Sequence, residues 1–281
     1  MSLTMFAATD LHISLAAETI FRIGPFPVTN AMVLGGLSVA VMLGLLFYAT
    51  SVLKKDGYNR FIGLLQWTFE GFLTQAEEII GDKKTARSIF PIAMTMFFTV
   101  LISYWASVLP GVGAIEWNGV PLFRGLPADL NFTFALAIIT IVASQVYAIR
   151  RHGAFGNAQR FLVNPFRDPL GAFVGILELI GEFSRLVALS FRLFGNAFAG
   201  EVLLIVIAVL AGAFSVVALP FFMGFELFIG FIQAYVFFVL TLIFTSLAIQ
   251  THGDHNTADE ISDGYSEESS KTKKPVEAQL E

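Results

Sequence analysis

The chain has 281 residues, of which 56% are hydrophobic and only 14% are charged, and its formal net charge is −5. Several uncharged apolar runs are long enough to cross about 30 Å of hydrocarbon, so the composition excludes a soluble domain and predicts an all-α integral membrane protein. The chain contains no cysteine, which excludes disulfides and thiolate metal sites.

Three membrane helices are predicted in the first half of the chain, at residues 30–53, 88–110 and 128–149. The first two carry no charge. The third is entered through Asp129 and Asn131, and because Asp and Asn favour the start of a helix, we interpret them as a cap rather than an ion site. Both stay candidates for a supporting role in an ion pathway.

Two features mark the membrane surfaces. Residues 58–80 form an amphipathic pattern, with aromatic and aliphatic side chains on one side and polar side chains such as Gln66 and Glu70 on the other. We interpret this segment as a helix lying at the cytoplasmic interface, although a soluble docking helix would give the same pattern. Tyr104 and Trp105, near the far end of the second predicted span, suit an interfacial aromatic belt.

The basic residues predict the orientation. The connection 54–87 holds six Lys and Arg and the connection 150–169 holds four, whereas residues 1–29 and 111–127 hold one each. Because cytoplasmic loops carry an excess of positive charge, we expect the N-terminus outside and both basic connections inside. Residues 111–127 contain many Gly and Pro and are predicted to form a loop.

The apolar segment 170–214 is too long for an ordinary span. As one helix it would be about 68 Å long, roughly twice the hydrocarbon thickness, so it must be tilted, bent or divided into two spans. Pro220 opens a last apolar run that ends at Gln250. One crossing by segment 170–214 places the following tail in the cytoplasm and two crossings place it outside. We favour two long, tilted helices in one hairpin, within a total of five to six membrane helices.

The chain divides into three parts by composition. Residues 1–29 form an extracytoplasmic N-terminal segment and lack the basic leader of a secretory signal peptide. Residues 30–250 form the membrane domain. Residues 251–281 are polar and hold too little apolar surface to fold alone, so we expect a disordered cytoplasmic tail.

Arg192 is the most informative single residue. A guanidinium stays protonated at physiological pH and needs hydrogen-bond acceptors. Placing one in hydrocarbon costs about 3 kcal/mol on insertion scales, so an arginine inside an apolar run is a functional candidate by default. A static salt bridge to an acid of the same chain is the structural alternative.

Other polar residues share the predicted helix with Arg192. Glu178, Arg185 and Arg192 recur at a spacing of seven, which places them along one stripe, and Glu182 and Asn196 fall close to it. Glu182 and Arg185 are three residues apart and can neutralise each other as a structural pair. Glu178 lies near the cytoplasmic end, where it can also contact lipid headgroups or a basic loop.

Glu201 lies on the opposite side of this helix from Arg192. In the last helix Glu226 and Gln233 share one face, since they are seven residues apart. An antiparallel hairpin would bring Glu201, Glu226 and Gln233 together as a wet lining, and chains of intramembrane carboxylates are typical of proton relays.

No catalytic motif is present: the sequence has no Gly-rich phosphate loop, no His-Glu-x-x-His and no Gly-x-Ser-x-Gly. We therefore expect no enzyme activity in this chain, no cofactor and no nucleic-acid partner. The four histidines, at 12, 152, 252 and 255, lie outside the predicted spans and are scattered, so we expect no metal site.

Two segments resemble the a subunit of F-type rotary ATP synthases of the bacterial type. They are residues 189–201, with the sequence LSFRLFGNAFAGE, and residues 225–237, with the sequence FELFIGFIQAYVF. Residues 90–93 and 126–131 are also similar to that family. With the layout of the spans, the resemblance covers about residues 20–250.

The resemblance implies that Arg192 is the essential stator arginine that faces a ring of c subunits. It also implies that Asn196, Glu201, Glu226 and Gln233 line two aqueous half-channels, which couple proton flow to ring rotation and ATP synthesis. The family often has His at the position of Glu226 and commonly has a basic residue at that of Arg185. The c-subunit ring, b-type peripheral stalk subunits and the other ATP synthase subunits are the implied partners, and ATP chemistry belongs to those other subunits.

The resemblance implies a bacterial inner membrane as the location, with lipid as the surrounding medium. We favour H⁺ over Na⁺ as the ion, and the sequence leaves that choice open. A secondary transporter is an alternative, but we find no inverted repeat of the expected kind. A structural scaffold is a second alternative, and it gives the polar residues Arg192, Asn196 and Glu201 no purpose.

Overall fold

The computed structural model describes residues 14, 16–54, 60–112, 115–117, 120–161 and 169–250, so the predicted tail 251–281 lies outside the described residues. The helices are α1 (Asn30–Leu53), α2 (Arg60–Ile80), α3 (Lys83–Ser107), α4 (Leu130–Phe161), α5 (Pro169–Leu210) and α6 (Ser215–Gln250), with short 3₁₀ turns η2 (Leu126–Ala128) and η3 (Gly212–Phe214). The strands are β1 (Thr19–Ile23), β2 (Phe26–Thr29), β3 (Glu116–Trp117) and β4 (Val120–Pro121).

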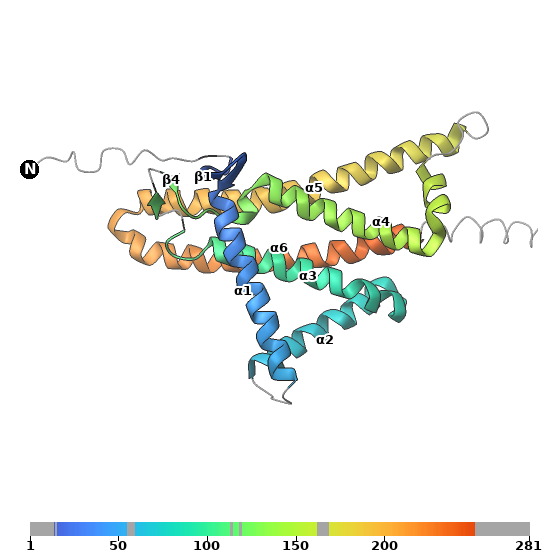
Figure 1. Cartoon of the computed structure of the whole chain (residues 1–281), viewed down its shortest axis with the longest axis horizontal. Coiled ribbons are helices and arrows are strands. Elements are labelled where there is room, and N and C mark those ends of the chain that lie inside the picture. The colour runs from blue at the N-terminus through green and yellow to red at the C-terminus, as the bar shows by residue number, and fades with distance from the viewer. Residues whose placement is uncertain are drawn as a thin grey trace, which may run out of the picture.

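Five helices of the described chain are long and apolar enough to cross a membrane, which confirms the predicted fold class. α5 is one continuous helix of 42 residues, so segment 170–214 does not divide into two spans. α5 and α6 form a hairpin that turns at η3 (Figure 1). α4 passes the predicted end at residue 149 and continues beyond a break at Gly153, whose φ of 79° is in the left-handed region.

The hairpin lies at a steep angle to α1 (Figure 1). α1 has 24 residues and is about 36 Å long, which suits an upright span, whereas the 42 residues of α5 correspond to about 63 Å. The two axes cannot both stand perpendicular to one bilayer. Tilting accommodates a helix that is longer than the hydrocarbon is thick, so these lengths favour the hairpin as the tilted element.

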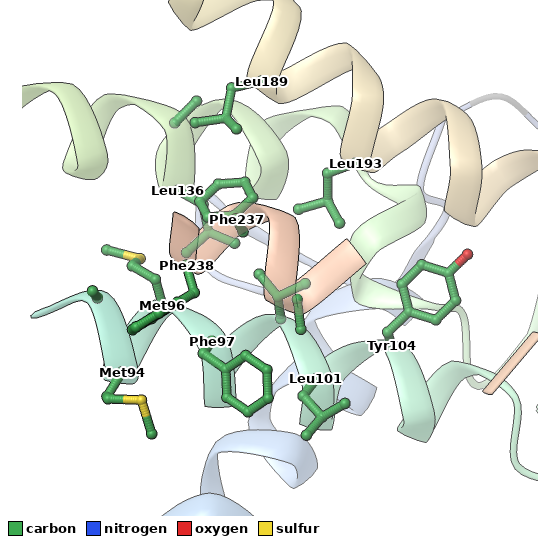
Figure 2. Packing of buried hydrophobic residues seen from close by; sticks show 14 of the residues in the cluster. Met94, Met96, Phe97, Leu101, Tyr104, Leu136, Leu189, Leu193, Phe237 and Phe238 are labelled. Carbon is green, nitrogen blue, oxygen red and sulfur yellow. The ribbon is translucent and has the colours of Figure 1, made fainter. Parts of the chain in front are cut away.

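Aromatic side chains from α3 and α6 form the centre of the packed core. Phe97, Phe237 and Phe238 are almost completely buried, and Leu193 of α5 lies against the same cluster (Figure 2). Burying a side chain of this size stabilises the fold by about 1.5–3 kcal/mol where water is the reference. In lipid the close packing itself carries more of the stabilisation.

The prediction of an interfacial belt is wrong for Tyr104. Its side chain is only 1% exposed and belongs to the core, because its ring lies over Gly230, where a Cβ atom would overlap it. Trp105 is 43% exposed, and its indole Nε1 donates to the carbonyl oxygen of Leu227 at 3.0 Å. Two adjacent residues of α3 therefore carry one buried and one exposed aromatic side chain.

α2 is a helix with one buried and one exposed side, as the amphipathic pattern predicts. Phe72 packs against Phe97 and Phe238, with ring centroids 4.8 and 4.7 Å apart. On the other side Leu64 and Trp67 are 61% and 76% exposed. One polar side chain of α2 also bonds to the bundle: the Gln75 amide donates to the hydroxyl of Tyr235 in α6.

α3 begins five residues before the predicted span, because Asp82 caps it. The Asp82 carboxylate accepts from the amides of Lys84 and Thr85 at 3.2 and 3.1 Å and from the Thr85 hydroxyl. The hydroxyl of Thr85, followed by the two amides, holds the pKa of Asp82 below its usual value. α3 therefore includes Lys83 and Lys84, which hydropathy alone leaves outside the predicted span.

Two small antiparallel hairpins lie outside the helices, one before α1 and one in the segment 111–127 that is predicted to form a loop. β1 pairs with β2 across Gly24, whose φ of 61° allows the tight turn, and β3 pairs with β4. The Thr29 hydroxyl then caps α1 by accepting from the amide of Met32 at 3.3 Å. The prediction of a simple loop at residues 111–127 is wrong for this part, because four of its residues pair as strands.

Candidate functional site

α5 and α6 carry the polar residues of the predicted pathway. Along α5, Glu201 lies toward the η3 turn, whereas Glu178, Glu182 and Arg185 lie toward its N-terminal end. Arg192 lies between these two groups. At 1.5 Å per residue it is about 13 Å along the axis from Glu201 and about 10 Å from Arg185.

Arg192 lies on an exposed surface of the hairpin. In the part of the chain that the structure describes, its guanidinium has no hydrogen bond and no ion pair. It borders a hollow of about 140 Å³ that Arg185, Leu240 and Phe244 also line. Within the described ranges no residue forms a static salt bridge with Arg192, so its guanidinium is free to take an acceptor at this surface.

Small side chains surround Arg192 on the same exposed stripe of α5. Ser184 and Ala188 precede it and Asn196 follows it at a helical spacing of four residues, and all three are exposed. Gly195 and Ala199 lie beside them and are exposed too. Small residues let a neighbouring membrane helix approach closely, so this stripe is suited to contact another helix.

Asn196 and Gln233 join α5 to α6 at this level. The Asn196 Nδ2 donates to Gln233 Oε1 at 2.8 Å, and Gln233 is only 3% exposed. Among the described residues no acceptor lies within reach of Gln233 Nε2, so this buried donor has unused capacity. A buried donor without an acceptor, such as Gln233 Nε2, indicates that a water molecule or another polar group binds nearby.

Glu226 is buried between three helices. Its carboxylate accepts from the hydroxyl of Tyr104 in α3 at 3.1 Å and is 3% exposed. It lies directly on the backbone of α5 at Gly200, where a Cβ atom would overlap the carboxylate. The absence of a side chain at Gly200 therefore makes room for an acid that a larger residue would displace.

Glu201 has a different environment from Glu226. Its carboxylate is 35% exposed and lies 3.9 Å from the Nε of Arg124, which is 5% exposed. Both side chains line a cavity of about 80 Å³, which is large enough for several water molecules. The predicted gathering of Glu201, Glu226 and Gln233 is thus realised as neighbouring positions with separate partners rather than as one cluster.

A second polar group lies on the other side of Arg192. Glu182 and Arg185 form the predicted ion pair at 3.0 Å, and Gln145 of α4 donates to the same carboxylate at 3.4 Å. The Arg185 guanidinium also lies over the ring of Phe244, 5.3 Å from its centre. Glu178, one turn earlier, is partly buried.

Asp129 and Asn131 act as the predicted helix cap. Asp129 Oδ1 accepts from the backbone amide of Asn131 at 2.9 Å and from its side-chain amide at 3.1 Å. These contacts satisfy the start of α4 and leave both residues at the same end of the molecule as Glu201.

Sequence reasoning missed three residues of this region. Arg124 appeared only as a loop charge, although it is the single basic residue of segment 111–127 and immediately precedes an apolar turn. Tyr104 was assigned to the membrane surface. Gly200 carried no signal of its own, because the overlap with Glu226 depends on how α5 packs against α6. No group of three potential metal ligands occurs within the described ranges.

Comparison with known proteins gives one consistent result. Residues 32–246 match the family described as ATP synthase A chain. The chain is similar to ATP synthase subunit a of Mycobacterium ulcerans (strain Agy99), with 31% identity over 234 residues that cover 81% of this chain and 90% of that protein. It is similar to ATP synthase subunit a of Aliivibrio fischeri (strain MJ11), with 34% identity over 223 residues that cover 75% and 82% of the two chains.

Proposed function

This chain belongs to the ATP synthase A chain family, and from that premise we propose that Arg192 is the fixed cation past which the acids of a c-subunit ring move. The chain is a multi-pass membrane protein and the non-catalytic, proton-translocating stator subunit of an F-type ATP synthase, whose other subunits are its partners. This membership confirms the resemblance of residues 189–201 and 225–237 and sets aside the transporter and scaffold alternatives.

The observation that carries the proposal is the exposure of Arg192 on a stripe of small residues. A guanidinium that faces hydrocarbon without an acceptor is costly, so the assembled complex must provide an anion at this surface. The flat stripe formed by Ser184, Ala188 and Asn196 lets a rotor helix come close enough to bring one. An acid in the middle of each c subunit would meet Arg192 in turn.

The mechanism follows from the charges. An ionised carboxylate cannot cross lipid alone, but it can pass while it pairs with Arg192, which cannot lose its own proton. A protonated rotor acid releases its proton to one half-channel on reaching Arg192, moves past as the anion, and takes a proton from the other half-channel. Because moving one charge through 100 mV yields about 2.3 kcal/mol, ATP synthesis has to collect several protons and a direct leak would waste them. The positive charge of Arg192 also repels a proton that would take that direct path.

Two routes reach this surface from opposite sides in our proposal. Glu201, Glu226, Asn196 and Gln233 form the half-channel toward the η3 turn. The pair Glu182 and Arg185, together with Glu178, forms the other. Asp129 and Asn131 support the first route at its outer end, where they hold the start of α4.

The remaining assignments are part of the same proposal. The excess of basic residues in connections 54–87 and 150–169 supports an extracytoplasmic N-terminus and a cytoplasmic tail at 251–281. We place the chain in a bacterial inner membrane, in contact with b-type stalk subunits as well as the c ring, with H⁺ as the ion. The membrane domain comprises residues 30–250.

The test is the variant Arg192→Ala in the assembled ATP synthase. In inverted membrane vesicles we expect normal amounts of complex and no ATP-driven acidification of the lumen. Arg192→Lys should restore little, because an ammonium can lose its proton and lacks the planar fork of the guanidinium. Arg150→Ala, at an exposed arginine in α4, is the matched control and should pump normally. Robust acidification by Arg192→Ala would reject the proposed role.

A further inference from the structure

A buried arginine outside the hairpin faces the pathway from the loop side. Arg124 precedes η2, and its guanidinium makes contacts in three directions. Its Nη1 donates to the carbonyl oxygen of Ala16, its Nη2 donates to that of Ala128 at 3.4 Å, and its Nε lies 3.9 Å from Glu201 Oε2. A side chain that only tied the loop together would need the two carbonyl groups and not the acid in α5.

The frame around Arg124 connects the N-terminal segment to the loop before α4. Asn30, at the start of α1, accepts from the amide of Glu18 at 3.1 Å and donates from Nδ2 to the carbonyl oxygen of Pro121 at 3.2 Å. These bonds and those of Arg124 hold two segments that are far apart in the sequence. The frame fixes where the Arg124 charge stands relative to α5.

This frame encloses the cavity of about 80 Å³ beside Glu201. Polar side chains of Ser14, Glu18, Asn30 and Arg124 form one side, and Glu201 with the apolar Phe198 forms the other. The volume and the polar groups are sufficient for several water molecules. Among the described residues the buried Glu201 Oε2 has no hydrogen-bond partner and lies against the charge of Arg124, whereas the side chain as a whole is 35% exposed and lines the cavity.

The carboxylate of Glu226 follows that of Glu201 along the proposed route. Gly200, the neighbour of Glu201 in α5, contacts the carboxylate of Glu226. A proton that reaches Glu201 from the cavity is therefore one residue away, along α5, from the buried acid of the hairpin.

We propose that Arg124 is a positioning residue of the extracytoplasmic half-channel, which holds the Glu201 carboxylate at the base of a mouth lined by Ser14, Glu18, Asn30 and Arg124. The inference rests on the proposed function and adds the entrance to it. Arg124 itself exchanges no proton. It keeps the acid oriented toward the cavity and keeps that acid from packing against the hairpin.

The first test uses the intact ATP synthase in vesicles with the variants Arg124→Gln, Arg124→Lys and Glu201→Gln. We expect Arg124→Gln to lower proton flux between about tenfold and about a hundredfold, as displacement of a positioned group does. Arg124→Lys should keep a larger share of the flux, because the positive charge remains. The double variant Arg124→Gln/Glu201→Gln should be no slower than Glu201→Gln alone, since Arg124 acts through Glu201. Normal flux in Arg124→Gln, or equal slowing in both backgrounds, would overturn the inference.

A second measurement decides the question where a variant is too slow or too poorly assembled to assay. The chain has no natural cysteine, so Val202→Cys introduces a single thiol into the cavity lining. Impermeant thiosulfonates should reach it from the outside only, whereas Leu43→Cys on the exposed face of α1 should not respond. In the Arg124→Gln background, an anionic reagent should modify Val202→Cys several-fold more slowly relative to a cationic reagent, because the attracting positive charge is gone. A purely steric role of Arg124 would leave this ratio unchanged.

The controls separate this inference from the proposed function. Arg22→Gln changes an exposed arginine of β1 at the same end of the molecule and should leave both flux and labelling unchanged. If Val202→Cys does not react from outside, or the reagent ratio is unchanged by Arg124→Gln, the entrance is elsewhere. Arg192→Ala would still abolish pumping in that case, so the proposed function would stand while this inference fell.

Discussion

At the scale of single residues, the site depends on where side chains are absent as much as on where charges are present. Glu226 can lie between α3, α5 and α6 only because Gly200 leaves room for its carboxylate, and Tyr104 can reach that acid only because Gly230 leaves room for its ring. Two glycines thus set the position of one titratable group. The same two contacts explain why an aromatic residue near a helix end is buried rather than in an interfacial belt.

Gly200→Ala tests this dependence. A glycine in a helix is normally less favourable than alanine by about 1 kcal/mol, so the same substitution at the open position Gly36 should be harmless. At Gly200 the new Cβ would overlap the Glu226 carboxylate and displace it. We expect proton flux to fall by about tenfold or more with little loss of assembled complex. Flux in Gly200→Ala equal to that of Gly36→Ala would show that the position of Glu226 is unimportant.

At the scale of elements, one aromatic ring of α2 contacts both helices on which α2 packs. Phe72 packs between Phe97 of α3 and Phe238 of α6. Replacing a packed phenylalanine by alanine costs about 3 kcal/mol in a typical core. Phe72→Ala should therefore loosen α2, and proteolysis of vesicles that expose the cytoplasmic side should cut residues 60–80 faster. Trp67→Ala, at a side chain on the opposite face, should leave the cleavage rate close to that of the unchanged protein.

Elements that depend on local patterns could be predicted from the sequence, and those that depend on distant contacts could not. Hydropathy predicted the spans and the hairpin, and the charge at Arg192 inside an apolar run indicated the surface where we propose the pathway. The start of α3 was misplaced because Asp82, outside the apolar run, caps the helix. The role of Arg124 was invisible because its partners Ala16 and Glu201 lie far away in the chain and meet it only through the folded loops.

At the scale of the whole molecule, the number of crossings fixes where the ends of each helix lie. If each of the five candidate spans of the described chain crosses the membrane once, the continuous α5 included, residues 30 and 250 lie on opposite sides, as the orientation that we propose requires. The η3 turn then shares a side with the two small β hairpins, whereas the α2–α3 connection lies on the other. In the orientation that we propose, the Arg124 cavity and the Glu182–Arg185 pair open toward opposite compartments, which a path through two half-channels requires.

Labelling single cysteines in the cysteine-free chain tests this arrangement directly. Ala213→Cys in η3 and Lys83→Cys at the start of α3 are both exposed positions. A membrane-impermeant maleimide should modify Ala213→Cys in whole cells and Lys83→Cys only in inverted vesicles, because the basic connection 54–87 stays in the cytoplasm. Arg22→Cys in β1 should behave as Ala213→Cys does. Modification of Ala213→Cys and Lys83→Cys from the same side would contradict the single crossing of α5 and, with it, the separation of the two routes that meet at Arg192.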